Sequence, residues 1–222
     1  MPKQKIITEY RHYTLPISFP VLILDEDRLK ISDEKAEYLH FHNCLEIGIC
    51  HSDSGYLEVN GKVFEFNAGD MICIPRNFVH TTYSKPGVRS EWSYIFLDTD
   101  ELFKGLLANS DFFDQFTTMA SNFKCIIYRD EYPELHYLVH SILKENKHQK
   151  TGYLSNIRAF LLATCIEIMR IQETYTKENI NNDVVHNDNL LVISPALNYI
   201  YRNYNQQFHV ELLSDMCHLS AT

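Results

Sequence analysis

The residues best suited to chemistry stand together at positions 40–46, where the chain reads His-Phe-His-Asn-Cys-Leu-Glu. Side chains alternate between the two faces of a β-strand, so His40, His42 and Glu46 are predicted to share one face. Two imidazoles and a carboxylate on one surface form a donor set for a divalent metal. His80 is expected to add a fourth ligand from a neighbouring strand. The pattern indicates either a metal site made of these four residues or the metal-free polar floor of a pocket.

Short strands joined by tight turns must position these residues. Asn60 and Gly61 stand between two alternating apolar runs within Tyr56–Phe66, and this dipeptide is typical of a type I′ hairpin turn. Further strands are expected at Leu45–Cys50, Met71–Ile74 and Trp92–Leu97. Many short strands with tight turns predict a sandwich or barrel over residues 1–98.

Residues 99–178 are predicted to be helical. Pro133 suits the start of a first helix, and a second helix is expected from about Leu154 to Tyr175. The second helix is apolar around almost its full circumference, so it needs two partners. One partner is the β core, and the other is the first helix or a second subunit. The candidate contacts of a homodimer on this helix are Leu154, Ile157, Leu161 and Ile168.

A polar, Asn-rich linker at residues 179–189 is predicted to separate this region from residues 190–222. In the last segment, Ser194 is expected to cap a helix and Pro195 to take its first position. A short second helix follows, and then a turn at Cys217–Ser220 leads toward a third helix. A helix, a short helix and a turn are the opening of a helix-turn-helix.

Residues 38–97 resemble the cupin family, which carries an HxH motif with Glu four residues later and a second motif of Gly, Pro and His. The residues at these motif positions are His40, His42, Glu46, Gly69, Pro75 and His80. Asn77 departs from the pattern, because many metal-binding cupins have Gly there. The resemblance implies a small double-stranded jelly-roll barrel with the four ligands facing its inside. With the helices predicted from periodicity, the expected fold class is mainly β plus α.

The segment Tyr199–Tyr204 resembles the start of the DNA-binding domain of the AraC family of transcriptional regulators. Leu219 and Ser220 match the opening of that family's recognition helix, whereas Ser214 stands where Ala is usual. The order of cupin barrel, helices, linker and helix-turn-helix implies the layout of this family: sensor, dimerisation element and DNA-binding domain. The recognition helix would begin near Ser220 or Ala221, so we expect this chain to hold the effector-binding and dimerisation portion, with DNA bound only by a longer protein.

Composition and charge limit the function classes. The net charge of −9, from 20 basic and 29 acidic residues, excludes a chain that coats nucleic acid through a globally basic surface. The six cysteines are scattered singly without a CxxC motif, which favours reduced thiols in a cytoplasmic protein. The first 20 residues show no signal-peptide core, and we expect no membrane association.

Aromatic and basic residues near the motifs are candidates for effector binding. Trp92 and Tyr94 offer faces for stacking on a sugar ring, whereas Arg76 offers a guanidinium for a small carboxylate. The alternative for Trp92 is an anchor in the core. Residues 1–20 form either a lid over the barrel mouth or a plain edge strand.

The resemblance implies a ligand-responsive, sequence-specific DNA-binding transcriptional regulator that is not an enzyme. The alternative is a metal-dependent cupin enzyme, a dioxygenase or an isomerase, because the His and Glu donors also suit metal catalysis. The helix-turn-helix opening favours the regulator, since an enzyme has no need for that segment.

Overall fold

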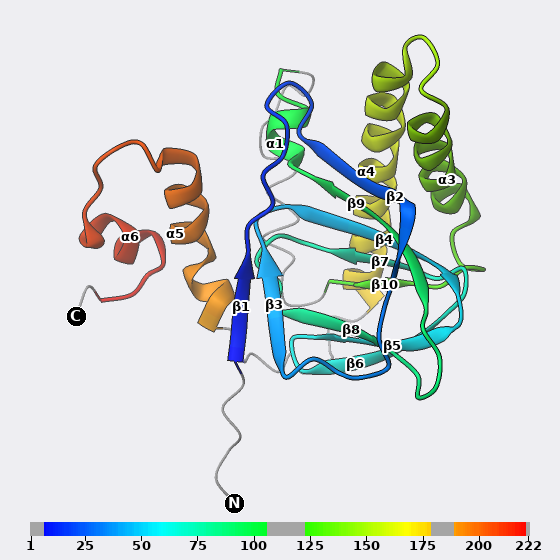
Figure 1. The fold of residues 1–222 in the computed structure, drawn as a ribbon. Helices are drawn as coiled ribbons and strands as arrows, with labels where there is room; N and C mark the ends of the chain where they lie inside the picture. The colour runs from blue at the N-terminus through cyan, green and yellow to red at the C-terminus, as the bar shows by residue number, and fades with distance from the viewer. Residues whose placement is uncertain (1–6, 106–122, 179–188, 221–222) are drawn as a thin grey trace, which may run out of the picture.

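The computed structural model describes residues 7–105, 123–178 and 189–220 (Figure 1). Its strands are β1 (Ile7–Arg11), β2 (Val21–Lys30), β3 (Tyr38–His42), β4 (Leu45–Ser52), β5 (Ser54–Val59), β6 (Lys62–Asn67), β7 (Met71–Ile74), β8 (His80–Ser84), β9 (Glu91–Leu97) and β10 (Ile126–Ile127). Its helices are α1 (Thr99–Leu102), α3 (Pro133–His148), α4 (Tyr153–Glu178), α5 (Asn189–Asn203) and α6 (Val210–Met216).

The strands form two five-stranded sheets with the orders β1-β3-β8-β5-β6 and β10-β7-β4-β9-β2. From β1 to β9, the chain changes sheets at every step except β5–β6. The pairs are antiparallel apart from β1 and β3, which run parallel. This topology confirms the predicted jelly-roll barrel with helices. It also makes β1 an edge strand. An edge strand was one of the two roles expected for residues 1–20, which we call the N-terminal arm.

The hairpin between β5 and β6 shows how local sequence determined part of the fold. Asn60 and Gly61 both have positive φ angles, 49° and 75°, and Val59 pairs with Lys62 across the turn. Positive φ at both central residues is the signature of a type I′ turn, whose twist matches that of the flanking strands. The predicted turn is therefore confirmed.

Strand β9 is buried on both faces. Trp92, Tyr94 and Phe96 alternate with Ser93 and Ile95, and each of these five side chains is at most 6% exposed. A strand buried on both faces needs cover on both sides. The first face lines the inside of the barrel, and α3 and α4 pack together over the second (Figure 1).

Helices α3 and α4 begin close to where the sequence predicts. Pro133 occupies the first turn of α3, where the missing N–H costs no hydrogen bond. The apolar stripe of α4, however, packs inside this chain: Ile157, Leu161 and Ile168 are 1%, 0% and 0% exposed. Their assignment to a dimer interface was wrong, because the core already occupies the stripe. Of the four candidates, Leu154 alone is exposed, at 42%.

The start of α5 also differs from the prediction. The helix begins at Asn189, so Ser194 is not an N-cap and Pro195 lies inside the helix. The apolar residues before the proline extend the helical pattern by more than a turn, and Pro195 removes one backbone donor from it. Residues 179–188 of the predicted linker lie outside the described part of the chain.

Helix α6 ends in the predicted turn. His218 adopts a left-handed φ of 52°, and the Leu219 N–H donates to the Ser214 carbonyl at 2.9 Å. The His218 N–H donates to the Asp215 carbonyl at 3.1 Å. The two bonds together form a Schellman motif, which closes the helix ahead of Leu219 and Ser220.

No helix among the described residues is long and apolar enough to cross a membrane.

The buried cysteines generate a prediction about thiol reactivity. Burial raises the pKa of Cys50, Cys125 and Cys165 to about 12. A thiol with this pKa has a thiolate fraction at pH 8 that is roughly a thousandfold below that of an ordinary cysteine. We expect these three residues to resist labelling by Ellman's reagent in the folded chain and to react at once in guanidinium chloride, with the sites identified by mass spectrometry. Rapid labelling of Cys165 in the folded chain would contradict its burial on the inward face of α4.

Candidate functional site

Three strands bring the predicted donor residues together inside the barrel. His40 and His42 come from β3, Glu46 from β4 and His80 from β8. His40 stands directly opposite His80 in the antiparallel register of β3 and β8. Residues 40–46 are not one strand, as the sequence analysis assumed, because β3 ends at His42 and β4 begins at Leu45 in the other sheet. Glu46 therefore meets His42 from the opposite sheet, rather than by alternation along one strand.

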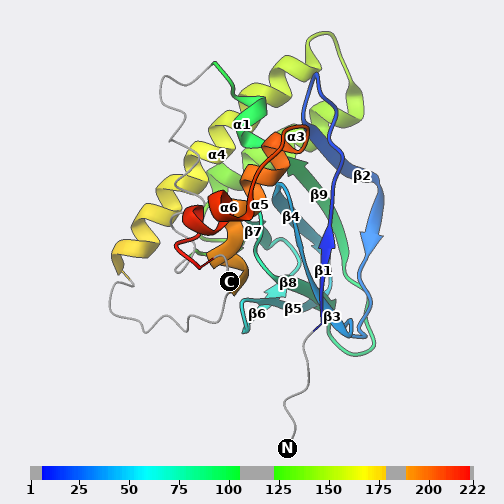
Figure 2. The same ribbon diagram turned by 90° about the vertical axis from the view of Figure 1, so that its left-hand side faces the viewer.

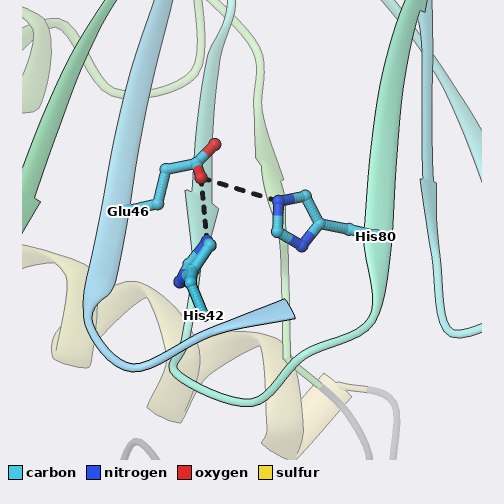
Figure 3. A group of neighbouring side chains, drawn as sticks. All are labelled: His42, Glu46 and His80. Atoms are coloured by element: carbon cyan, nitrogen blue, oxygen red, sulfur yellow. Dashed lines mark hydrogen bonds and ion pairs between the residues drawn. The ribbon is translucent and has the colours of Figure 1, made fainter. Parts of the chain in front are cut away.

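The donor atoms converge on one carboxylate oxygen (Figure 3). His42 Nε2 lies 2.9 Å from Glu46 Oε2, and His80 Nε2 lies 3.5 Å from the same oxygen. All three side chains are nearly inaccessible to solvent, at 0%, 5% and 1% exposure for His42, Glu46 and His80. The donor atoms lie within 4.8 Å of one another, which is the spacing of a metal-binding group.

Backbone carbonyls orient both imidazoles. His42 Nδ1 lies 2.9 Å from the Cys44 carbonyl, and His80 Nδ1 lies 2.9 Å from the Phe78 carbonyl. A carbonyl oxygen only accepts, so each Nδ1 carries a proton and each Nε2 is turned toward Glu46. Metal-binding histidines commonly donate their second N–H in this way. With neutral imidazoles, two nitrogen lone pairs would face a carboxylate, and this arrangement requires a positive charge between them.

Glu46 supplies the negative charge of the site. Burial by itself raises the pKa of a carboxyl group, but the hydrogen bond with His42 and the nearby His80 imidazole outweigh burial and hold the pKa of Glu46 well below its usual range. At 3.5 Å, the contact between His80 Nε2 and Glu46 is too long for a firm hydrogen bond. Among the described residues, this buried nitrogen has no hydrogen-bond partner. The site thus holds an ionised carboxylate and an unsatisfied ring nitrogen.

His40 lies beside this group without joining it. Its ring centroid is 4.2 Å from that of His80, but its donor atoms are not part of the three-residue group found among the described residues. Burial, together with the neighbouring His80 and Arg11, lowers the pKa of His40 to about 2, so its ring is neutral. The structure therefore assembles three of the four predicted ligands closely and places the fourth next to them.

Tyr13 covers the site, a role that no pattern in the sequence predicts. Its ring stacks on Phe96 with centroids 4.2 Å apart and meets the edge of His42 at 5.8 Å. The Asn43 side chain holds the arm there, because its Oδ1 accepts from the Tyr13 N–H at 2.8 Å and its Nδ2 donates to the Tyr13 carbonyl at 3.1 Å. Burial and the charge of Glu46 raise the pKa of Tyr13 to about 12. One aromatic residue in an N-terminal arm carries no distinctive sequence signal.

Trp92 and Tyr94 lie in the packed interior. Trp92 is 0% exposed, stacks on Tyr94 at 5.7 Å and donates its indole N–H to Ser90 Oγ at 2.9 Å. Gly48 stands opposite Tyr94, where a Cβ atom would come within 2.9 Å of the Tyr94 ring. These contacts make Trp92 the core anchor that was its alternative role, and they leave no exposed face of Trp92 for a sugar ring.

Arg76 is engaged by this chain's own carboxylates. Its Nη2 lies 3.1 Å from Asp100 and 3.6 Å from Asp98, and its side chain is 9% exposed. These contacts disfavour its proposed role as the partner of an effector carboxylate.

The backbone conformation of Asn77 accounts for its departure from the cupin motif. Its φ of 66° lies in the left-handed region, which Gly adopts without strain and Asn tolerates better than most residues. In this conformation, the Asn77 N–H donates to the His42 carbonyl at 2.9 Å. The residue therefore supports the site through its backbone, as a glycine would.

Comparison with known proteins gives one family and several structures. The model of the family "AraC-like ligand binding domain" matches residues 32–144, half of the chain. The AraC-like transcriptional activator CuxR is similar at 12% identity and a TM-score of 0.45, over 81% of this chain and 58% of that chain. ToxT K231A from Vibrio cholerae is similar at 11% identity and a TM-score of 0.49, over 94% of this chain and 73% of that chain.

A cupin protein from Bacteroides fragilis is similar at 18% identity and a TM-score of 0.30, over 40% of this chain and 67% of that chain. No curated protein sequence matches this chain. The chain spans less than two thirds of the length of CuxR, 58%.

Proposed function

Because this chain belongs to the family of AraC-like ligand-binding domains, we propose that it is the ligand-sensing portion of a transcriptional regulator that acts in the cytoplasm. The family match, which extends from the segment before β3 into α3, carries the proposal. In this proposal, residues 1–98 are the sensor, residues 99–178 the dimerisation element, residues 179–189 the linker and residues 190–222 the opening of a helix-turn-helix domain.

The N-terminal arm gives this sensor a part that can respond to a ligand. Tyr13 is held over the barrel interior by one stacking contact and by two hydrogen bonds with Asn43. A small-molecule effector shifts an equilibrium only if it binds one arrangement better than another. We therefore assign the arm after β1 as a lid, whose placement depends on whether an effector is bound.

A metal-dependent enzyme is disfavoured by the same contacts. Glu46 and both of its imidazole partners are at most 5% exposed, and Tyr13 stands over them. A substrate would have to displace Tyr13 to reach the donor atoms. A sensor needs only to bind its ligand, whereas an enzyme must repeat this opening at every turnover.

The geometry fits a divalent metal ion held by His42, Glu46 and His80. The two oriented imidazoles, the ionised carboxylate and the unpartnered His80 nitrogen suit a cation among them. When bound, the ion would neutralise Glu46 and act as a Lewis acid toward an oxygen atom of the effector. His42, Glu46 and His80 would hold and orient the ion, and Tyr13 would lie over it.

We propose that the chain forms a homodimer through the apolar side chains that α4 leaves exposed. Leu154 is exposed and Ile166 is partly exposed, whereas the inward stripe of the helix is filled by the core. Helix α3 and the barrel core cover the buried residues of α4, and a second copy would cover the apolar side chains that remain exposed.

The metal assignment predicts a ligand-dependent gain in stability. Saturating Mn²⁺ or Zn²⁺ is expected to raise the melting temperature of the chain by several degrees, since binding to the folded state alone contributes about 2.7 kcal/mol at a hundredfold excess over Kd. Glu46→Gln and His80→Ala should abolish the shift, whereas Glu65→Gln on the surface should retain it. Scanning fluorimetry and elemental analysis provide the measurements. A wild-type chain that stays metal-free after loading would mean that a proton, rather than a metal, compensates Glu46.

The dimer proposal predicts that substitutions on α4 halve the molecular mass of the protein in solution. The wild-type chain should be a dimer by light scattering, and the double variant Leu154→Lys/Ile166→Lys should be a monomer with unchanged circular dichroism. Thr174→Lys adds a charge at another exposed position of the helix and should leave the dimer intact. A monomeric wild-type chain, or a dimeric double variant, would contradict this interface.

The regulator proposal predicts that selective DNA binding needs residues beyond this chain. Helix α6 is the last of the described helices, and the turn at His218 closes it. The 222-residue chain should give no sequence-selective gel shift. A longer chain that continues past Thr222 should enrich one sequence from random DNA. Failure of the longer chain to select any sequence would overturn the proposed function.

A further inference from the structure

Three histidines outside the barrel interior lie where α3 meets the outer face of the second sheet. His136 and His140 belong to α3, and His51 lies near the end of β4. Helix α3 contacts β2 of the same sheet, and Figure 1 and Figure 2 both show this helix and strand side by side. None of the three histidines belongs to the interior group of His42, Glu46 and His80.

A chain of hydrogen bonds holds His51 on the outer face of the sheet. Trp92 and Tyr94 stack inside the barrel, so Ser93 between them faces outward. His51 Nε2 lies 2.6 Å from Ser93 Oγ, and Ser93 Oγ donates to Asp25 Oδ1 at 2.5 Å. Because a hydroxyl group has one proton to donate, His51 Nε2 carries a proton and donates to Ser93. The neutral ring therefore has its lone pair on Nδ1.

His136 and His140 share one face of α3. Residues four apart are neighbours on a helix surface, with Cβ atoms about 5–6 Å apart, and two imidazoles at this spacing can bind one metal ion. His136 Nε2 is buried and has no hydrogen-bond partner among the described residues, whereas the His140 side chain is exposed. A buried ring nitrogen without a partner is unfavourable, and a bound metal ion would satisfy it.

The surroundings favour the neutral rings that a metal requires. Burial, together with Arg28 and His140, lowers the pKa of His51, and burial together with His140 lowers the pKa of His136. The charge of His140 acts on both other rings, as expected where the three lie near one another. Within the described part of the chain, these rings form no ion pair with a carboxylate.

We propose that His51, His136 and His140 bind one divalent transition-metal ion, with Cu²⁺ preferred, and that this ion links α3 to β4. Imidazole nitrogen suits Cu²⁺, Ni²⁺ and Zn²⁺, and the affinity of such sites is highest for Cu²⁺. Among the described residues, the interior group is the one whose donor atoms already lie within 4.8 Å of one another. Binding at the three histidines therefore requires the exposed His140 side chain to turn toward the other two rings.

The site connects two parts of the chain that pack against each other. His51 belongs to a barrel strand, whereas α3 belongs to the helical element that follows the barrel. An ion bound to both would stabilise the contact between helix and sheet, since it binds the packed arrangement better than a separated one. The site is independent of the proposed function, because it requires neither an effector nor DNA.

Titration calorimetry with Cu²⁺ tests the site. His140→Ala should weaken Cu²⁺ binding at least about tenfold, since even the loss of a group that only orients a ligand has an effect of this size. His148→Ala removes another exposed histidine of α3 and should leave the affinity unchanged. The interior group is intact in both variants, so its contribution to the titration is constant. Unchanged affinity in His140→Ala, or an equal loss in His148→Ala, would overturn the proposal.

A further variant tests the link to β4. His51→Ala should weaken Cu²⁺ binding as much as His140→Ala does, and electron paramagnetic resonance of the bound Cu²⁺ should show one nitrogen ligand fewer. Circular dichroism establishes that the variant is folded. An unchanged affinity and spectrum in a folded His51→Ala chain would overturn the link between α3 and β4. Cu²⁺ binding with these losses, in a protein that selects no DNA, would leave this inference standing while the proposed function fails.

Discussion

The compensation of a buried carboxylate is the constraint on which the barrel interior depends. Glu46 is 4% exposed and ionised, and an uncompensated charge at such a site costs several kcal/mol. The compensating imidazoles of His42 and His80 belong to the first sheet, whereas Glu46 belongs to the second. The electrostatic contact therefore joins the two sheets at one end of the barrel. Any cation held there, proton or metal, strengthens the same link.

The segment that supplies this contact also anchors the arm. Between β3 and β4, the Cys44 carbonyl orients His42, and the Asn43 side chain binds the backbone of Tyr13. Tyr13 faces the interior, while its neighbours in the arm, such as Leu15, line a groove outside the barrel, between the arm, α1 and α5. A displacement of the arm would thus alter both the cover of the interior and the contact with α5. This shared segment gives the fold a physical route from barrel to helix.

Local rules predicted the parts of the fold that depend on few neighbours. Asn60 and Gly61 form their turn because both tolerate positive φ, and Pro133 begins α3 because it lacks an N–H. The rules failed where distant packing decides. Residues 40–46 span two strands in opposite sheets, and Ile157 packs in the core rather than at a subunit interface. Periodicity shows that a helix face is apolar, but it does not show what covers that face.

The sequence by itself determined the donor types, the cupin motif and the order of barrel, helices and helix-turn-helix opening, because these depend on residue identity and spacing. Only the tertiary structure decided which donors meet. The donor atoms of His42, Glu46 and His80 converge because the chain changes sheets after β3. The alternation of side chains along one strand cannot predict such a change of sheet. The tertiary structure also decided that Tyr13 covers the site and that a groove forms between the arm, α1 and α5. Both features join segments far apart in sequence, and their contacts form only when the whole chain packs.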